Sequence, residues 1–161
     1  MTRRVLIGAA TAAALAGCSR KRPEQLPPRP DLAVLLAAIA NEERLIALYE
    51  SARTRHPELG RHLDPLLAHH RAHLTVLRRH YVPGTNGGPA PSGPTASPAG
   101  GPTPAVPRGR RRTVTALRSA ESHAAAARTA DLTKVSAGMA QLFASIGACE
   151  AGHAAWLTRL A

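Results

Sequence analysis

Apolar side chains recur at steps of three and four residues in four stretches of the chain, which is the spacing of amphipathic α-helices. The pattern predicts helices over residues 31–53, 58–81, 113–134 and 135–160. Asp31 follows Pro30 and is a candidate N-cap for the first helix. Pro65 is expected to kink or delay the second helix. The chain is therefore predicted to be all-α.

Ionisable residues interrupt the apolar stripe of every predicted helix, although such groups are costly to bury without a partner or a metal. Nearly the same number of residues separates Glu42 from His73 and Glu121 from His153. Matching spacing places the polar residues at one height in two helical hairpins, which predicts a four-helix bundle. The residues of this polar layer are Glu42, Glu43, His70, His73, Glu121, Glu150 and His153.

Two segments outside the helices are rich in proline. Residues 18–30 combine basic charge with proline and are expected to be a tether. Residues 82–112 are rich in Pro, Gly, Ser and Thr and end in a basic run at residues 108–112, so we expect a disordered loop. This loop is long enough to cross the length of the bundle between helices two and three. The expected domain, 31–161, thus contains a first hairpin at 31–81 and a second at 113–161.

Residues 1–17 have the pattern of an export signal: paired arginines and then an apolar run that is too short to span a bilayer. The segment Leu15-Ala16-Gly17-Cys18 resembles the lipobox of bacterial lipoproteins. This resemblance implies acylation of Cys18, for example with palmitate, and a lipid anchor on the extracytoplasmic face of the cell membrane. An ordinary secretory signal with a chance cysteine is the alternative. The paired arginines also resemble a twin-arginine signal, so the export route stays open.

The chain carries 21 Lys and Arg against 10 Asp and Glu, a formal net charge of +11. An exported protein would rarely meet nucleic acid, and one Phe, one Trp and two Tyr offer few rings for stacking on bases. We therefore exclude nucleic acid and expect attraction to anionic lipid or cell-wall polymer.

The order of the polar residues resembles that of the ferritin-like superfamily. Glu150-x-x-His153 matches the motif of helix four, Glu121 falls where helix three carries a Glu, and Asn41-Glu42 followed by Tyr49 is similar to the opening motif of bacterioferritins. With the lipobox, the chain is similar to the ferritin-like lipoproteins of high-GC Gram-positive bacteria. Many of these lipoproteins look metal-free, so the resemblance implies either metal ligands in the polar layer or a degenerate metal site.

One departure from that family changes the expected metal. His70 stands where helix two should supply a bridging Glu, and one imidazole nitrogen cannot bridge two irons as a carboxylate does. We therefore expect one Zn, Cu, Ni or Fe ion, or none, rather than a di-iron centre. Glu42 is preferred over Glu43 by the tyrosine spacing, whereas Glu43 lies nearer the centre of the apolar stripe. Without a metal, the same residues would form a hydrogen-bonded polar layer.

Two other features have simpler interpretations beside the functional ones. A second line of histidines, at steps of seven, four and seven, would form a surface stripe that either binds Zn or Cu weakly or is a solvated flank. Cys149 is expected to be a small buried apolar group. The members of the stripe are His62, His69, His73 and His80.

Three hypotheses for function follow from the sequence. The first is a binding or structural surface protein with a degenerate metal site and no enzymatic activity. The second is a metal-binding or oxidoreductase protein that uses the interior Glu and His, and the third is a homodimer in which hairpins pair between chains. The sequence contains no G-x-S-x-G elbow, P-loop or Cys-x-x-Cys pair.

Overall fold

The computed structural model describes residues 30–81 and 104–161. Within these ranges the chain is helical and contains no strand, which confirms the all-α prediction and the four helices. Cys18, the export signal, the tether and residues 82–103 lie outside the described residues. The elements are α1 (Pro30–Arg55), η1 (Pro57–Leu59), α2 (Gly60–His80), α3 (Arg110–Asp131), η2 (Leu132–Lys134) and α4 (Ala137–Thr158), where η marks a short 3₁₀ helix.

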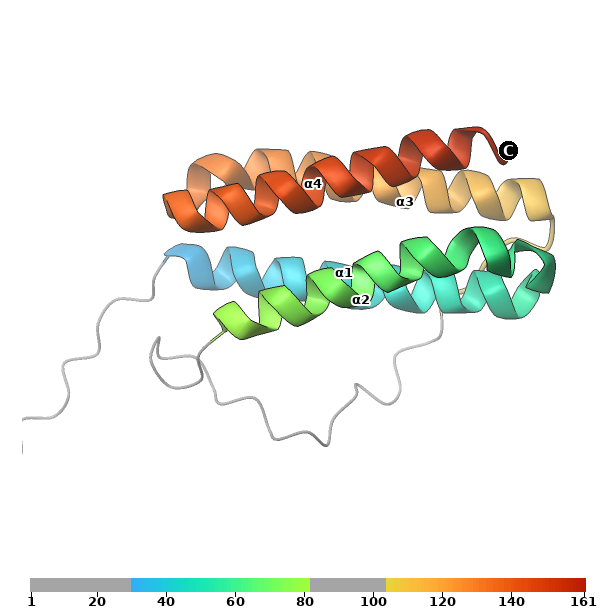
Figure 1. Cartoon of the computed structure of the whole chain (residues 1–161), viewed down its shortest axis with the longest axis horizontal. Coiled ribbons are helices and arrows are strands. Elements are labelled where there is room, and N and C mark those ends of the chain that lie inside the picture. Colours follow the sequence, from blue (N-terminus) through green and yellow to red (C-terminus); the bar gives the residue numbers. More distant parts are fainter. Residues whose placement is uncertain (1–29, 82–103) are drawn as a thin grey trace, which may run out of the picture.

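The four helices lie lengthwise beside one another as two hairpins, α1 with α2 and α3 with α4 (Figure 1). At one end of the bundle, Asp31 Oδ1 accepts a hydrogen bond from the backbone N–H of Ser136 at 3.0 Å. At the other end, His56 Nε2 lies 3.1 Å from Thr113 Oγ1. The start of α1 thus meets the start of α4, and the end of α1 meets the start of α3. It follows that α2 and α3 run in the same direction, with the end of α2 and the start of α3 at opposite ends of the bundle.

Several helix ends differ from the predicted ones. Asp31 lies in the first turn of α1 and bonds to Ser136, so it does not cap its own helix. Pro65 neither delays nor interrupts α2, which continues from Gly60 through His80. The basic residues 110–112 are not a loop end, because they form the first turn of α3 after Gly109 at its N-cap.

The apolar core forms two clusters, one toward each end of the bundle. Tyr49, Leu63 and Leu117 belong to the first, and Leu35 and Phe143 belong to the second. A fully buried Leu or Phe contributes about 1.5–3 kcal/mol. The two clusters therefore stabilise the bundle on either side of the polar residues that lie between them in sequence and in space.

The buried face of α4 differs from the predicted one by about one residue. The structure buries Glu150 and Leu157, whereas Cys149 and Trp156 are half-buried. Gly147 lies on this buried face, where a Cβ would lie 2.9 Å from Arg128 Cβ. The glycine allows α3 to approach α4 closely. None of the helices in the described ranges combines the length and apolarity needed to cross a bilayer.

Candidate metal centre

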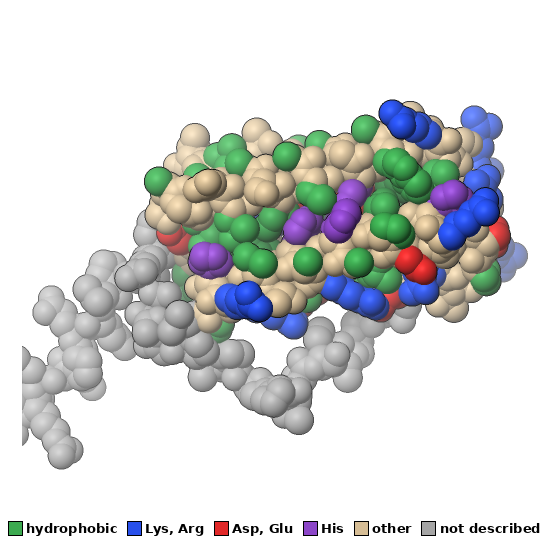
Figure 2. Space-filling view, viewed as in Figure 1, with side chains coloured by type: hydrophobic (Ala, Val, Ile, Leu, Met, Phe, Trp, Pro, Cys, Tyr) green, Lys and Arg blue, Asp and Glu red, His purple; other side chains and the backbone are tan. Residues whose placement is uncertain are grey.

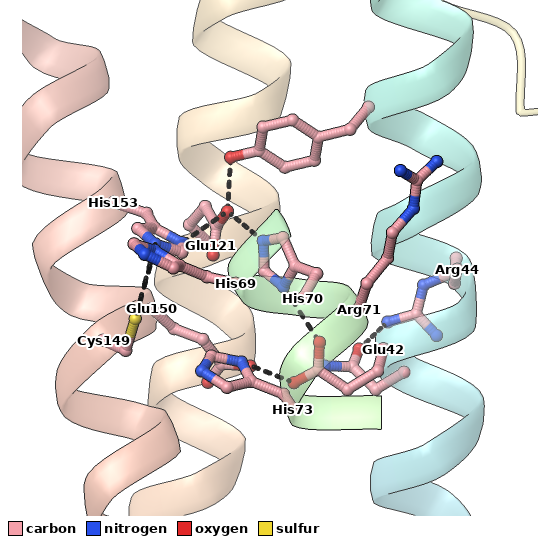
Figure 3. Close-up of polar contacts among 12 residues, drawn as sticks. Glu42, Arg44, His69, His70, Arg71, His73, Glu121, Cys149, Glu150 and His153 are labelled. Carbon is pink, nitrogen blue, oxygen red and sulfur yellow. Dashed lines mark hydrogen bonds and ion pairs between the residues drawn. The ribbon is translucent and has the colours of Figure 1, made fainter. Parts of the chain in front are cut away.

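The polar layer occupies the middle of the bundle and draws on all four helices (Figure 3). Its carboxylates are Glu42 on α1, Glu121 on α3 and Glu150 on α4, and all three are fully buried. His70 on α2 is also fully buried, and His153 on α4 is nearly so. Buried charges need partners, so the contacts of these groups decide what the layer does.

His70 lies at the centre of the layer, between two carboxylates. Its Nδ1 is 2.9 Å from Glu42 Oε2, and its Nε2 is 2.8 Å from Glu121 Oε1. Burial alone would lower the pKa of His70, but its hydrogen bonds to Glu121 and Glu42 outweigh burial and raise the pKa to about 9. Without a metal, His70 is therefore a buried imidazolium that donates to both carboxylates.

Glu121 is the common acceptor of the layer. Its Oε1 accepts hydrogen bonds from His70 Nε2 and from the Tyr49 hydroxyl, and it lies 3.3 Å from His153 Nδ1 as a less well aligned charge contact. Burial raises the pKa of Glu121, but bonding to His153, His70 and Tyr49 lowers it overall to about 2. Glu121 is thus ionised and accepts hydrogen bonds from the His70 ring and the Tyr49 hydroxyl. In metal sites, a carboxylate that accepts the N–H of a histidine ring fixes the orientation of that ring, so that its other nitrogen can bind the ion.

Glu42, His70 and His73 form the first group of potential ligands, with ligand atoms within 4.8 Å of one another. Glu42 uses one oxygen for His70, while its Oε1 lies 3.4 Å from His73 Nδ1. Neither Glu42 Oε1 nor His73 Nδ1 has a hydrogen-bond partner, although both atoms are buried. Burial raises the pKa of Glu42, but His70 and His73 more than compensate and lower it. The donor set therefore fits a divalent transition-metal ion.

A second group shares His70 with the first. His70, Glu121 and His153 also place one ligand atom each within 4.8 Å of the others. A neutral imidazole has only one nitrogen free to ligate, since the other carries a proton. Neutral His70 could therefore serve only one of these two groups at a time, which suits one ion here rather than a pair.

Two of the predicted ligands lie outside every ligand group formed by the described residues. Glu43 is on the outer side of α1 and pairs with Arg78 at 2.7 Å. Glu150 is interior, but its Oε1 lies 4.0 Å from Arg128 Nε and neither carboxyl oxygen has a hydrogen-bond partner. Burial and the nearby charge of Glu42 raise the pKa of Glu150 to about 8, so this carboxyl is neutral at physiological pH.

The four histidines of the predicted stripe do not meet at one site. His73 turns inward to Glu42, and His69 turns toward His153, with His69 Nδ1 3.0 Å from His153 Nε2. His62 packs against Trp156, with ring centroids 5.6 Å apart, and His80 is exposed.

Several residues of the site were not expected from the sequence. Cys149 is not a buried apolar group: it is half-buried, and its Sγ lies 3.4 Å from His153 Nε2. Burial, together with nearby carboxylates, raises the pKa of the Cys149 thiol. The Cys149-x-x-x-His153 spacing, one helical turn, was the signal that could have placed the thiol beside the imidazole.

Arg128 was also not expected in the interior. It is fully buried, with its guanidinium 5.2 Å from the centroid of the Phe143 ring.

Neither a known protein family, nor a curated protein, nor a solved structure matches this chain. The fold and the side chains thus define a four-helix protein with a buried layer of Glu and His. Its function has to be inferred from that layer.

Proposed function

We propose that the chain is a lipid-anchored, extracytoplasmic metal-binding protein of ferritin-like architecture that holds one divalent transition-metal ion with Glu42, His70 and His73. One observation carries the proposal. Glu42 Oε1 and His73 Nδ1 face each other at 3.4 Å, are buried, and have no hydrogen-bond partner. Buried polar atoms in native proteins are nearly always paired, and an ion between these two atoms would pair both.

The distances in this group suit a small divalent ion. Two ligands of a tetrahedral Zn²⁺ with bonds of about 2.0–2.1 Å lie about 3.3 Å apart. The separation of Glu42 Oε1 and His73 Nδ1 is 3.4 Å, and that of Glu42 Oε2 and His70 Nδ1 is 2.9 Å. Two imidazoles and one carboxylate bind Zn²⁺, Fe²⁺, Ni²⁺ and Cu²⁺, and Cu²⁺ should bind most tightly of the four.

The ferritin-like assignment is supported by the direction of the helices and the order of the polar residues. The helices α2 and α3 run parallel, with the end of α2 and the start of α3 at opposite ends of the bundle. The carboxylates of Glu42 on α1 and Glu121 on α3 are fully buried. His70 in place of a bridging Glu, and Glu150 turned to Arg128, argue for one ion instead of two irons.

A metal-free scaffold is the second candidate. It is favoured by the imidazolium of His70, which donates to Glu42 and Glu121 at once and so satisfies much of the layer without an ion. In this case the protein would be a binding or structural surface protein, and the polar layer would be a remnant of a metal site.

Metal content separates the two candidates. The protein is purified without a His tag after native export, and metals are counted by mass spectrometry. We expect His73→Ala to hold one equivalent less than His80→Ala, a matched control that removes an exposed histidine from the same helix. A folded protein in which these variants hold equal amounts of metal would support the scaffold.

Anchoring is proposed through Cys18 in Leu15-Ala16-Gly17-Cys18. Cys18→Ala should move the protein from the membrane to the soluble fraction, and unchanged retention in the membrane would contradict a lipid anchor.

The basic surface suggests where a polymer would bind. Residues 110–112 are exposed arginines at the start of α3, at the end of the bundle opposite Pro30 (Figure 1). Figure 2 shows basic side chains gathered at this end. Pro30, the described residue nearest to Cys18 in the sequence, lies at the other end of the bundle. Anionic cell-wall polymer is therefore a better partner for the basic end than the lipid surface.

A further inference from the structure

We propose that His69, Cys149 and His153 form a second metal site, at the seam between α2 and α4, that binds a thiophilic ion, Zn²⁺ or Cu⁺. Figure 3 shows these three side chains together, on the far side of Glu121 from Glu42. Their ligand atoms lie within 4.8 Å of one another. The proposal does not depend on an ion at Glu42, because the two ligand sets share no residue.

The distances match those around a tetrahedral ion. With bonds of about 2.0–2.1 Å to nitrogen and about 2.3 Å to sulfur, nitrogens lie about 3.3 Å apart and nitrogen lies about 3.6 Å from sulfur. The observed separation of His69 Nδ1 from His153 Nε2 is 3.0 Å. Cys149 Sγ lies 3.4 Å from His153 Nε2 and 3.9 Å from His69 Nδ1. Movements of a few tenths of an ångström would therefore complete the site.

Glu121 prepares His153 for this role. The Glu121 carboxyl group lies 3.3 Å from His153 Nδ1, a geometry that favours the tautomer with its proton on that nitrogen. His153 Nε2 then presents a lone pair to Cys149 and His69. In this tautomer, and without an ion, the lone pair would accept an N–H from His69 Nδ1, which lies 3.0 Å away, and the two rings are stacked with an interplanar angle of 7°. An ion would replace that shared proton, and His69 would carry its proton on Nε2 instead.

Exposure makes this site accessible in a way that the interior site is not. His69 is exposed and Cys149 is half-buried, whereas His153 is buried. Figure 2 shows histidine side chains at the surface in the middle of the molecule, along the seam between the hairpins. Three protein ligands leave a fourth position of a tetrahedral ion open to solvent. Such a site suits acquisition and exchange of an ion.

The choice of ion follows from the sulfur ligand. Thiolates select soft ions, Cu⁺ and Zn²⁺, over Mg²⁺ and Ca²⁺, which prefer oxygen. On binding, Cys149 releases its S–H proton to solvent and the sulfur–metal bond forms, while both imidazoles stay neutral and no electron is transferred.

Co²⁺ is the probe for the test, since a Co²⁺–thiolate bond gives a charge-transfer absorption that oxygen and nitrogen ligands do not. The full chain carries Cys18→Ala in every sample, which leaves Cys149 as the only thiol. We expect one equivalent of Co²⁺ to produce the band, and Zn²⁺, or Cu⁺ supplied under argon, to remove it, whereas Mg²⁺ should not.

Variants assign the band to the proposed ligands. Cys149→Ser should abolish it, and His69→Ala should weaken Co²⁺ binding at least about tenfold, since even changes to outer-shell partners of metal sites cost about 10–100-fold. His80→Ala is the control and should keep the band. His73→Ala should also keep the Co²⁺–thiolate band, but it should lose the ion at the site of Glu42, His70 and His73. Failure of that site and failure of the Cys149 site are therefore distinguishable.

Two outcomes would overturn the proposal. One is the absence of the band in protein with a helical circular dichroism spectrum, and the other is a band that survives in Cys149→Ser. Protection of Cys149 from alkylation by iodoacetamide, measured with and without Zn²⁺ in the unmutated site, tests the same ligand if a variant fails to fold. Equal alkylation rates would count against the proposal.

Discussion

Replacing Glu150 by Gln should stabilise the metal-free protein at neutral pH. The carboxyl is fully buried, and burial with the charge of Glu42 raises its pKa from 4.5 to about 8. At neutral pH the side chain is therefore protonated in the folded state and ionised in the unfolded chain. Folding must take up a proton, which costs free energy, whereas glutamine has the same shape and needs no proton.

The magnitude follows from linkage between protonation and folding. Because the folded pKa is raised, the penalty is absent below about pH 4.5, grows as the pH rises and is complete above about pH 8. Each pH unit within this window costs about 1.4 kcal/mol. At about pH 7, Glu150→Gln should therefore raise the free energy of unfolding by up to about 3 kcal/mol, and at about pH 4 it should change it little.

Urea unfolding followed by circular dichroism, in the presence of EDTA, measures this difference. Glu43→Gln is the matched control, because Glu43 lies on the same bundle but pairs with Arg78 at the surface. An exposed pair contributes about 0–1 kcal/mol, so the control should lose at most that amount. A loss of stability in Glu150→Gln at neutral pH would refute the reasoning, since it would mean that Glu150 is ionised and stabilised by Arg128.

Three further predictions concern the same region. Tyr49→Phe removes the hydroxyl that donates to Glu121 and should lower the free energy of unfolding by about 1.5–3 kcal/mol, measured by urea unfolding; an unchanged value would show that this bond is not formed in solution. The pKa of Glu121 is lowered from 4.5 to about 2, so its stabilisation is complete above about pH 4.5 and should be lost as the pH falls toward 2. An acid titration in which Glu121→Gln shows the same pH dependence as the unmutated chain would contradict this. Gly147→Ala places a Cβ 2.9 Å from Arg128 Cβ and should destabilise the protein by about 1–3 kcal/mol, seen as a lower thermal midpoint, while Gly152→Ala, with open space at its Cβ, should not.

The four helices and the height of the polar layer could be predicted because periodicity and spacing are local properties of the sequence. Glu42 was preferred over Glu43 from its spacing to Tyr49, and Glu42 is the buried residue while Glu43 faces Arg78. His70 was singled out as a departure from the ferritin-like pattern, and its two ring nitrogens join the carboxylates of α1 and α3.

The register of α4 could not be predicted in the same way. The helix α4 is rich in Ala and Gly. The face that contains Cys149 and the face that contains Glu150 are therefore both apolar enough in sequence to be buried. The choice between them depends on tertiary packing, in particular on Gly147 against Arg128. The contact of His69 with His153 could not be predicted from the sequence either, because it depends on how two helices from different hairpins face each other.

The two proposed sets of metal ligands differ in which parts of the chain they join. Glu42, His70 and His73 all belong to the first hairpin, whereas His69 comes from the first hairpin and Cys149 and His153 come from the second. An ion at the seam would thus bind only when the hairpins are docked, and at a concentration of 100 times its Kd it would favour the docked state by about 2.7 kcal/mol. The concentration of a soft metal ion around the protein would in this way set how firmly the two halves of the bundle hold together.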